Sequence, residues 1–508
     1  MHNFNAGHSL NNNWETFFPS FEESRSLYGQ YFLSVDPLVH VVHRPSFDLE
    51  YSHFSFTSPH LTRNQTPFRA LLLSVFFAAA VSLRASQSER LFGVRKETMV
   101  EKLKFAAETA LSAANHTDFV DLQTLQALTI FLFGRCAEDI DTSHAALIEK
   151  LIHLAKLAGL HRNDEYLYLT PLEIQVRRLL WYQICSIDVH IAKNLGSQLS
   201  IRDDDFDTPL PFNINDADLN DYSATRVPRN GWTDVALTLI KFEYHLLFRQ
   251  TLRQIIAVKD GTLDIKTARR LNDQHRKKIE AKYFSNSDHR PPIECYAKLA
   301  SCLFAARCDV ALLYRDAQVG AGLPHRNELQ DAAINASLFI TESAATLETA
   351  PDLGTWAWHP YFHQQYFPAI FLLMEIYRNP NLPRAERINA ILDYAFGRSP
   401  GLNSREKNRD TLRLLLRKLQ EDEQHQAVNY ADARREPSME AFPTTANIGF
   451  SHGESAAVPW SWQTIEDPFQ MDTCSSAAHA DDLMWASNDQ IGSGIHQNLF
   501  ESLAISQG

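Results

Sequence analysis

The chain has 508 residues, of which 44% are hydrophobic, and it carries a formal charge of −13. This length and apolar content exclude a wholly disordered protein, because the chain can bury a sizeable core. The acidic balance argues against the large exposed basic surface with which proteins that bind DNA directly neutralise phosphates. The longest basic run, HRKK at residues 275–278, is interpreted as a solvated face of a helix.

Residues 1–20 are predicted to be a flexible N-terminus, and they lack the basic start and apolar run of a signal peptide. The most apolar segment, residues 68–85, is shorter than the roughly 20 residues of a membrane span and has charges close by. It is predicted to be a buried helix. We therefore expect no membrane partner.

From residue 21 to residue 425 the hydrophobic pattern has the period of a helix. Gly159 stands where a helix C-cap belongs, and Thr170, Pro171 and Glu173 together predict the N-cap, first turn and capping box of the next helix. Further helices are predicted at Asp234–Val258, Ile293–Tyr314, Glu328–Thr349, Gln364–Tyr377, Arg384–Phe396 and Glu406–His425. Alternating strand patterns are almost absent. The fold class is predicted to be all-α, with one large helical domain over residues 21–425.

A dense acidic stretch follows Gly196, the residue at which one helix is predicted to end: Asp203, Asp204, Asp205 and Asp207. A calcium loop begun at Asp203 would need Gly and Glu where Thr208 and Ile214 stand. A catalytic carboxylate pair needs one member in an apolar pocket, whereas these residues are expected to be solvated. The stretch is interpreted as a structural turn between helices, without a metal or a catalytic role, that ends in Pro209 and Pro211.

Two histidine pairs have spacings that could place both imidazoles on one helical face, His40 with His43 and His359 with His363. Neither pair encloses the Glu of a zinc protease motif, and no third ligand is evident. They are interpreted as satisfied core or surface histidines. The stretch from Trp356 to Phe367 is rich in aromatic residues that could line a pocket, although ordinary core packing is the favoured interpretation.

The cysteines are scattered, which suits a reducing compartment with free thiols. They are Cys136, Cys185, Cys295, Cys302, Cys308 and Cys474. On a helix Cys295 and Cys302 stand about 10 Å apart, too far to share one zinc ion, so the middle three are interpreted as core residues. No nucleophile elbow, phosphate loop or dinucleotide fingerprint occurs in the sequence. We predict no metal, no cofactor and no catalytic activity.

The composition changes over residues 426–508, which are predicted to be a disordered acidic and aromatic tail. Residues 451–508 contain no Lys or Arg, and eight acidic residues are interleaved with large apolar ones. This pattern is typical of activation segments, while a solubilising tail is the alternative. The expected anchors for a coactivator are Trp460, Trp462, Phe469 and Trp485.

Several blocks in order resemble the regulatory middle homology region of fungal-specific transcription factors. The first is YFLSVDPLVHVVHRPSFDLEY, where Pro37, His43, Pro45 and Phe47 match the family's opening. The others are LAKLAGLHRND, then RRLLWYQICSIDVHIAKNLGSQLSIRDDDFDTPLP with its acidic loop, and GTWAWHPYFHQQYF. The resemblance implies an all-helical regulatory domain and a nuclear location.

Members of that family usually carry an N-terminal binuclear zinc cluster of six cysteines. The roughly 30 residues before the first block contain no Cys, so these residues do not support zinc-dependent DNA binding. We expect a regulator of metabolic or secondary-metabolite genes that contacts DNA only indirectly or weakly, or a shortened relative of a complete factor.

The expected partners are a DNA-binding transcription factor, coactivators and a small-molecule effector, with a homo- or heterodimer also open. The alternative hypothesis is a small-molecule-binding helical protein, or an enzyme that reuses the fold.

Overall fold

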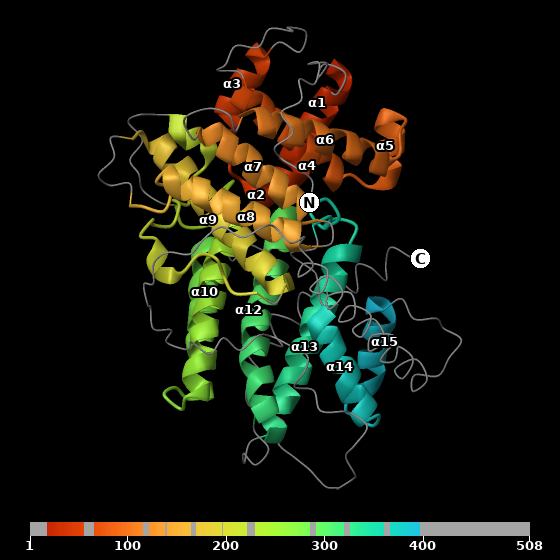
Figure 1. Ribbon diagram of the computed structural model, residues 1–508. Helices are drawn as coiled ribbons and strands as arrows, with labels where there is room; N and C mark the ends of the chain where they lie inside the picture. Colours follow the sequence, from red (N-terminus) through yellow and green to blue (C-terminus); the bar gives the residue numbers. More distant parts are fainter. Residues whose placement is uncertain are drawn as a thin grey trace, which may run out of the picture. The chain divides into compact units, whose positions relative to one another are not determined.

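Helices account for all the regular secondary structure of the part of the chain that the computed structural model describes (Figure 1). That part comprises residues 18–54, 66–114, 121–137, 140–163, 169–195, 197–220, 229–284, 291–319, 326–359 and 366–396. All of these residues lie within one compact unit, Met1–Ser455. The all-α prediction is therefore confirmed.

The N-terminal helices are α1 (Phe21–Gln30), the π-helix η2 (Tyr31–Val35), α2 (Asp36–Val39), α3 (Arg44–His53), α4 (Thr66–Ser82), α5 (Ala85–Phe92), α6 (Lys96–Ala114), α7 (Leu122–Arg135), α8 (Thr142–Leu157) and α9 (Pro171–Leu195). The short 3-10 helices η5 (Asp203–Asp205) and η6 (Asp216–Asn220) follow. The remaining helices are α10 (Ala236–Lys259), α11 (Ile265–Tyr283), α12 (Pro292–Val319), α13 (Arg326–Thr349), α14 (Tyr366–Arg378) and α15 (Ala385–Ala395).

Helix α4 lies at the centre of the N-terminal half, where it packs against α1, η2, α6 and α7. Almost every side chain from Pro67 to Ser82 is buried, as expected for a helix that is hydrophobic all round. The apolar segment is thus a buried helix, as its sequence predicts. It stops at Ser82 because Arg84 has an extended backbone, and the Arg84 amide donates to Gln87 Oε1 (2.9 Å) to begin α5. Among the described residues, no helix is long and apolar enough to cross a membrane.

The C-terminal half continues as packed neighbours: α10 against α12, α12 against α13, and α13 against α14 and α15 (Figure 1). One large hydrophobic core, reaching from Leu27 to Trp356, joins the two halves. A smaller core lies between α13, α14 and α15. Packing is therefore continuous along the described part of the unit.

The helix boundaries follow the local signals in the sequence closely. Glu173 and Thr170 exchange the two capping-box hydrogen bonds at the start of α9, with distances of 2.8 and 3.2 Å. After α8, Gly159 has a φ of +72° and the Leu160 amide donates to Ala155 O (3.0 Å), which is the hydrogen bond of a Schellman motif. The predicted helix end at Gly196, the helix Glu406–His425 and the tail 426–508 lie outside the described residues.

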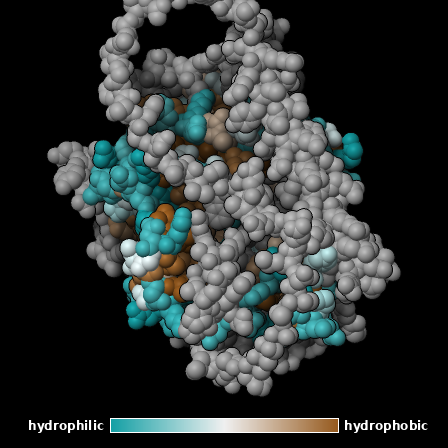
Figure 2. All heavy atoms as spheres, turned by 60° about the horizontal axis from the view of Figure 1, so that its bottom comes forward, coloured by the Kyte–Doolittle hydropathy of each residue, from teal (hydrophilic) through white to brown (hydrophobic). Residues whose placement is uncertain are grey.

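Figure 2 shows hydrophobic residues at the surface beside hydrophilic ones on one face of the molecule. The most exposed large apolar side chains are spread over several elements: Phe21 of α1, Leu157 of α8 and Ile256 of α10 each have at least 60% of their surface accessible. Apolar residues scattered in this way are normal on a folded protein. None of them marks an interface by itself.

Candidate functional site

A buried charged cluster ties the start of the domain to the segment that follows the acidic loop. His40 Nδ1 lies 2.9 Å from Asp36 Oδ2, and its Nε2 lies 3.2 Å from Asp216 Oδ1. His40 ends α2 in the left-handed conformation, with φ 35°, and this backbone geometry points the ring between the two carboxylates. We call Asp36, His40 and Asp216 the His40 cluster.

The His40 cluster holds an imidazolium between two acids. Burial alone would lower the pKa of His40, but the nearby Asp36 and Asp216 outweigh it and raise that pKa well above its ordinary value. Burial would likewise raise the pKa of Asp216, but the hydrogen bond and charge of His40 lower it. Burial raises the pKa of Asp36. The positive charge of His40 therefore lies between the two carboxyl groups and favours the ionised form of Asp216.

The second histidine of this motif, His43, caps α3. Its Nδ1 accepts from the Ser46 hydroxyl (2.7 Å), and its Nε2 donates to the backbone carbonyl of Asp216 (3.1 Å). His359 is also buried, and its Nε2 donates to Phe133 O (2.9 Å). These three histidines are satisfied core residues, as predicted, and His363 lies outside the described residues.

The acidic loop is a structural connector whose carboxylates reach solvent, and three of the four also have hydrogen-bond partners in the fold. Asp203, Asp204 and Asp207 are exposed and Asp205 is half-buried. Asp203 Oδ1 accepts from Arg249 Nε (2.7 Å), Asp205 Oδ2 accepts from Lys156 Nζ (2.9 Å), and Asp207 Oδ1 accepts from the Asn163 amide (2.7 Å). The three carboxylates face different partners on α8, α10 and the turn after α8, so they hold the loop down instead of converging on an ion.

Asp188, a buried carboxylate on α9, holds the same loop through hydrogen bonds. Asp188 accepts from the amides of Ser200 and Ile201, both at 3.1 Å, and burial raises its pKa. Arg249 donates from Nη2 to Ile201 O (2.6 Å). The loop is thus fixed to α9 and α10 at once. Sequence reasoning missed Asp188 and Arg249, because a single charge inside a long helix looks the same whether it faces solvent or a loop.

Lys241 is the most deeply buried lysine or arginine among the described residues, with 1% of its surface accessible. Its Nζ donates to Leu38 O (2.6 Å) and to Gln183 Oε1 (2.5 Å), so it joins α10 to α2 and α9. Burial lowers its pKa well below the ordinary lysine value. The sequence holds a weak signal for this site, a lone Lys within the apolar run ALTLIKF.

The aromatic stretch after α13 covers η2 near the N-terminus. Trp356 Nε1 donates to Leu33 O (3.1 Å) and Trp358 Nε1 donates to Ser34 O (3.0 Å). The two indoles thus attach the aromatic stretch to the backbone of η2. The described part of the stretch therefore serves as ordinary core, which is the favoured interpretation of its sequence.

Comparison with known proteins finds a family whose model part of the chain matches. Residues 29–259 match the model of the fungal specific transcription factor domain. This region is therefore similar to the domain of that family. It contains the His40 cluster, the acidic loop and Lys241, so the family domain includes all three of these connections.

Relatives along the chain are transcription factors. The C6 finger domain transcription factor hasF of Aspergillus fumigatus is 23% identical over 404 residues, 70% of this chain and 52% of the relative. The aurofusarin cluster transcription factor aurR2 of Gibberella zeae is 25% identical over 354 residues, 67% and 51% of the two chains. The pyriculol/pyriculariol biosynthesis cluster transcription factor 1 of Pyricularia oryzae is 33% identical over 209 residues, 41% and 27%. The chain spans about half the length of the first two.

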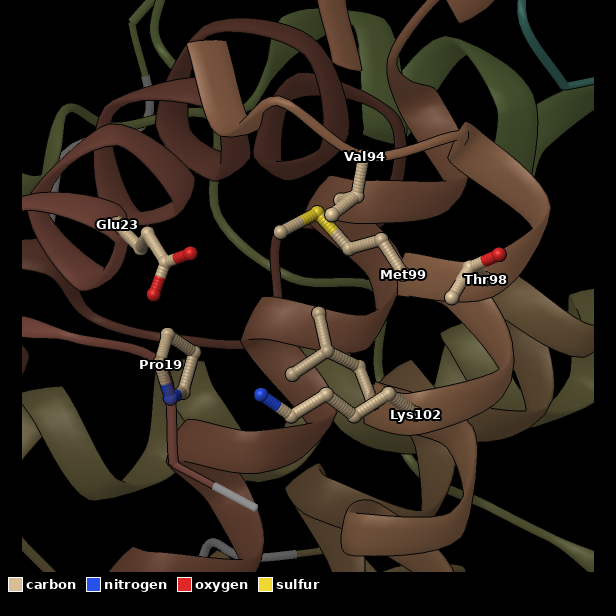
Figure 3. A pocket seen from close by; sticks show the side chains of 7 residues that line it. Pro19, Glu23, Val94, Thr98, Met99 and Lys102 are labelled. Carbon is tan, nitrogen blue, oxygen red and sulfur yellow. The ribbon is translucent and has the colours of Figure 1, made fainter. Parts of the chain in front are cut away.

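A small hollow lies at the edge of the family domain between α1 and α6 (Figure 3). Its volume is about 90 Å³, and Glu23, Val94, Met99 and Lys102 are among the residues that line it. In Figure 3 the side chains of Glu23 and Lys102 extend toward it from opposite walls. Drug-sized ligands fill pockets of about 300 Å³ or more, so this hollow is too small to enclose one.

The cysteines only partly fit the sequence interpretation. Cys308 is buried, but Cys302 is half-buried and Cys295, in the first turn of α12, is exposed, so the three do not form a row of core residues. In the part of the chain that the structure describes, no three His, Cys, Asp or Glu side chains come together as a metal site.

The basic run on α11 is arranged as a helix face. Arg276 pairs with Asp273 (2.7 Å) and Glu280 (2.8 Å), Lys277 pairs with Asp273 (2.8 Å), and Lys278 is exposed. Two of its basic groups therefore already have carboxylate partners. The predicted coactivator anchors Trp460, Trp462, Phe469 and Trp485 lie outside the described residues.

Proposed function

We propose that this chain is the regulatory part of a fungal transcription regulator that controls a secondary-metabolite gene set. The observation that carries the proposal is the match of residues 29–259 to the fungal specific transcription factor domain. Two of the relatives are named for biosynthetic clusters, those of aurofusarin and of pyriculol and pyriculariol. The proposed location is the nucleus, and we assign the chain no catalytic activity.

DNA contact is proposed to come from outside these residues. The six cysteines of the sequence are scattered and include no C-x2-C pair, so they do not supply the closely spaced ligands of a zinc module. The His40 cluster and the acidic loop fix helices to one another. A partner or further sequence of a longer chain would provide the DNA-binding module.

The proposed activation segment is residues 451–508. An acidic and aromatic segment can bind a coactivator by placing a few large rings in a shallow groove, while its acids steer the encounter. Fused to an unrelated DNA-binding domain, this segment should activate a reporter gene. Replacement of Trp460, Trp462, Phe469 and Trp485 by Ala should abolish the activity, whereas replacement of an equal number of Ser residues should not.

The regulatory role is tested by a chromatin profile of the tagged chain in its own host. Enrichment at promoters of one biosynthetic gene set, together with loss of their transcripts after deletion, is the expected result. Absence of promoter enrichment with nuclear partners present would contradict the proposal. If the reporter fusion is inactive, residues 451–508 are not an activation segment. Regulation would then depend on the helical domain alone.

A further inference from the structure

The hollow between α1 and α6 has a buried apolar floor and a polar rim (Figure 3). On α6 the spacing i, i+4 places Met99 and Leu103 in one row, and both are buried, with 7% and 1% of their surface accessible. Thr98 and Lys102 form the neighbouring row of the same helix and are exposed. A group that enters the hollow therefore meets polar atoms at the rim and apolar atoms at the floor.

Two further segments complete the walls of the hollow. Pro19, directly before α1, is buried, and Val94, in the turn after α5, has 39% of its surface accessible. Both side chains are aliphatic. The volume that remains is about 90 Å³. Because a cavity of about 150 Å³ accepts benzene, this hollow has room for a branched aliphatic group of about three or four carbon atoms.

Glu23 holds a carboxylate on the α1 side of the hollow. Its Oε2 accepts from the Ser20 amide at 2.7 Å, and its own amide donates to Ser20 Oγ at 3.3 Å. This capping box fixes the Glu23 side chain against the first turn of α1. No hydrogen bond within the described residues uses Oε1, so this second oxygen remains available to a donor.

Lys102 extends toward the hollow from the wall opposite Glu23 (Figure 3). Its side chain forms no hydrogen bond or salt bridge with the residues that the structure describes, Glu23 included. An ammonium and a carboxylate thus stand on opposite sides of an apolar hollow without pairing. A molecule that carries both charges matches this arrangement, because each of its charges then meets one of opposite sign.

We propose that the hollow binds a small α-amino acid with a branched aliphatic side chain. The side chain of the amino acid would fill the hollow against Met99 and Leu103. Its ammonium would donate to Glu23 Oε1, and its carboxylate would accept from Lys102 Nζ. A hydrocarbon would satisfy neither protein charge, and a simple anion or cation would satisfy only one. The site is independent of the proposed regulatory role, because binding is measured on the purified chain.

The expected affinity is low. Both charged groups lie near the rim, where solvent screens them, and exposed ion pairs contribute little free energy. A buried isopropyl group together with two such pairs corresponds to a dissociation constant of about 1–10 mM. The measurement must therefore detect weak binding.

The test uses L-valine and the full chain in saturation-transfer-difference NMR, with thermal unfolding as a second readout. L-Valine should bind saturably, show its strongest transfer at the methyl protons that lie in the hollow, and raise the melting temperature. Isovalerate lacks the ammonium and L-valinamide lacks the carboxylate, so each should bind about two- to fivefold more weakly. L-Phenylalanine should not compete, because its ring needs a cavity of about 150 Å³.

Variants assign each charge of the ligand to its partner. Glu23→Gln keeps a capping-box residue and should make L-valine and isovalerate bind equally, whereas Lys102→Met should make L-valine and L-valinamide bind equally. Each variant should weaken L-valine binding about two- to fivefold. The matched controls Glu22→Gln and Lys278→Met, at exposed positions, should leave it unchanged.

Three results would overturn the proposal. The first is no saturation by L-valine up to about 50 mM, a concentration well above the expected dissociation constant. The second is L-valine binding that both Glu23→Gln and Lys102→Met retain in full. The third is competition by L-phenylalanine as strong as that by L-valine itself.

Discussion

Replacement of His40 by Asn should lower the free energy of unfolding of the domain, because it removes one buried positive charge. Asn tolerates the left-handed backbone that His40 adopts at φ 35°, so the change leaves the conformation of the C-cap acceptable. It leaves Asp36 and Asp216 buried close to each other without the imidazolium between them. The expected loss is therefore electrostatic and not conformational.

The size of the loss follows from the contacts of His40. Two charge-assisted hydrogen bonds disappear, each worth about 1.5–3 kcal/mol, and broken buried ion pairs typically cost about 3–5 kcal/mol. Proton uptake by one aspartate limits the damage. Neutralising a carboxyl of ordinary pKa about 3.9 at pH 7 costs about 4 kcal/mol. We expect the free energy of unfolding to fall by about 3–4 kcal/mol at pH 7.

The pH dependence has a defined direction. The pKa of His40 is raised on folding, so its stabilisation is complete below the unfolded value of about 6.5 and is lost as the pH rises through the folded value. The pKa of Asp216 is lowered, so its stabilisation is present above about 3.9 and is lost as the pH falls through its folded value. The difference between wild type and His40→Asn should therefore shrink at acidic pH, where protonated carboxyls no longer need the imidazolium.

Urea unfolding of both chains at pH 7 and pH 5, followed by tryptophan fluorescence and circular dichroism, measures this difference. His153→Asn at an exposed position of α8 is the matched control and should change stability by less than about 0.5 kcal/mol. A loss below about 1 kcal/mol at pH 7 would refute the reasoning, since that is the value of a surface pair. So would a loss that stays constant between the two pH values.

Two further predictions concern the loop and the helix ends. Arg249→Met should lower the free energy of unfolding by about 1–3 kcal/mol, because it strands a buried carbonyl and weakens the attachment of Asp203, whereas Asp204→Asn should have almost no effect in the same urea titration. Gly159→Ala should destabilise by about 1 kcal/mol because its φ is +72°. Gly29→Ala, inside α1 with open space around it, should stabilise by about 0.5–1 kcal/mol. A lower urea midpoint for Gly29→Ala than for Gly159→Ala would contradict these backbone conformations.

The fold could be predicted from the sequence wherever the deciding interaction is local. Capping at Thr170 and the left-handed turn at Gly159 depend on residues within a few positions, so their patterns predict the start of α9 and the end of α8. The buried character of α4 follows from its composition alone.

The connections between helices could not be predicted in the same way. Asp188, Arg249 and Lys241 meet partners that are 12 to 203 positions away, and a charge in a helix carries no sign of what it will face. The same limit applies to the ion pairs of the acidic loop, because Lys156 and Arg249 are far from it in sequence. The cysteines of α12 show it as well, since a periodic row does not reveal that Cys295 lies in an exposed first turn.

The indole bonds from Trp356 and Trp358 to η2 bear on how the protein is made. They join residues 323 and 324 positions apart. The carbonyls of Leu33 and Ser34 can therefore accept these bonds only after most of the domain has been synthesised. At roughly 5–20 residues per second, the delay on the ribosome is about 16–65 s. The N-terminal helices thus remain open to chaperones during that time. A fragment that stops at residue 259, where the family match ends, would never receive this cover.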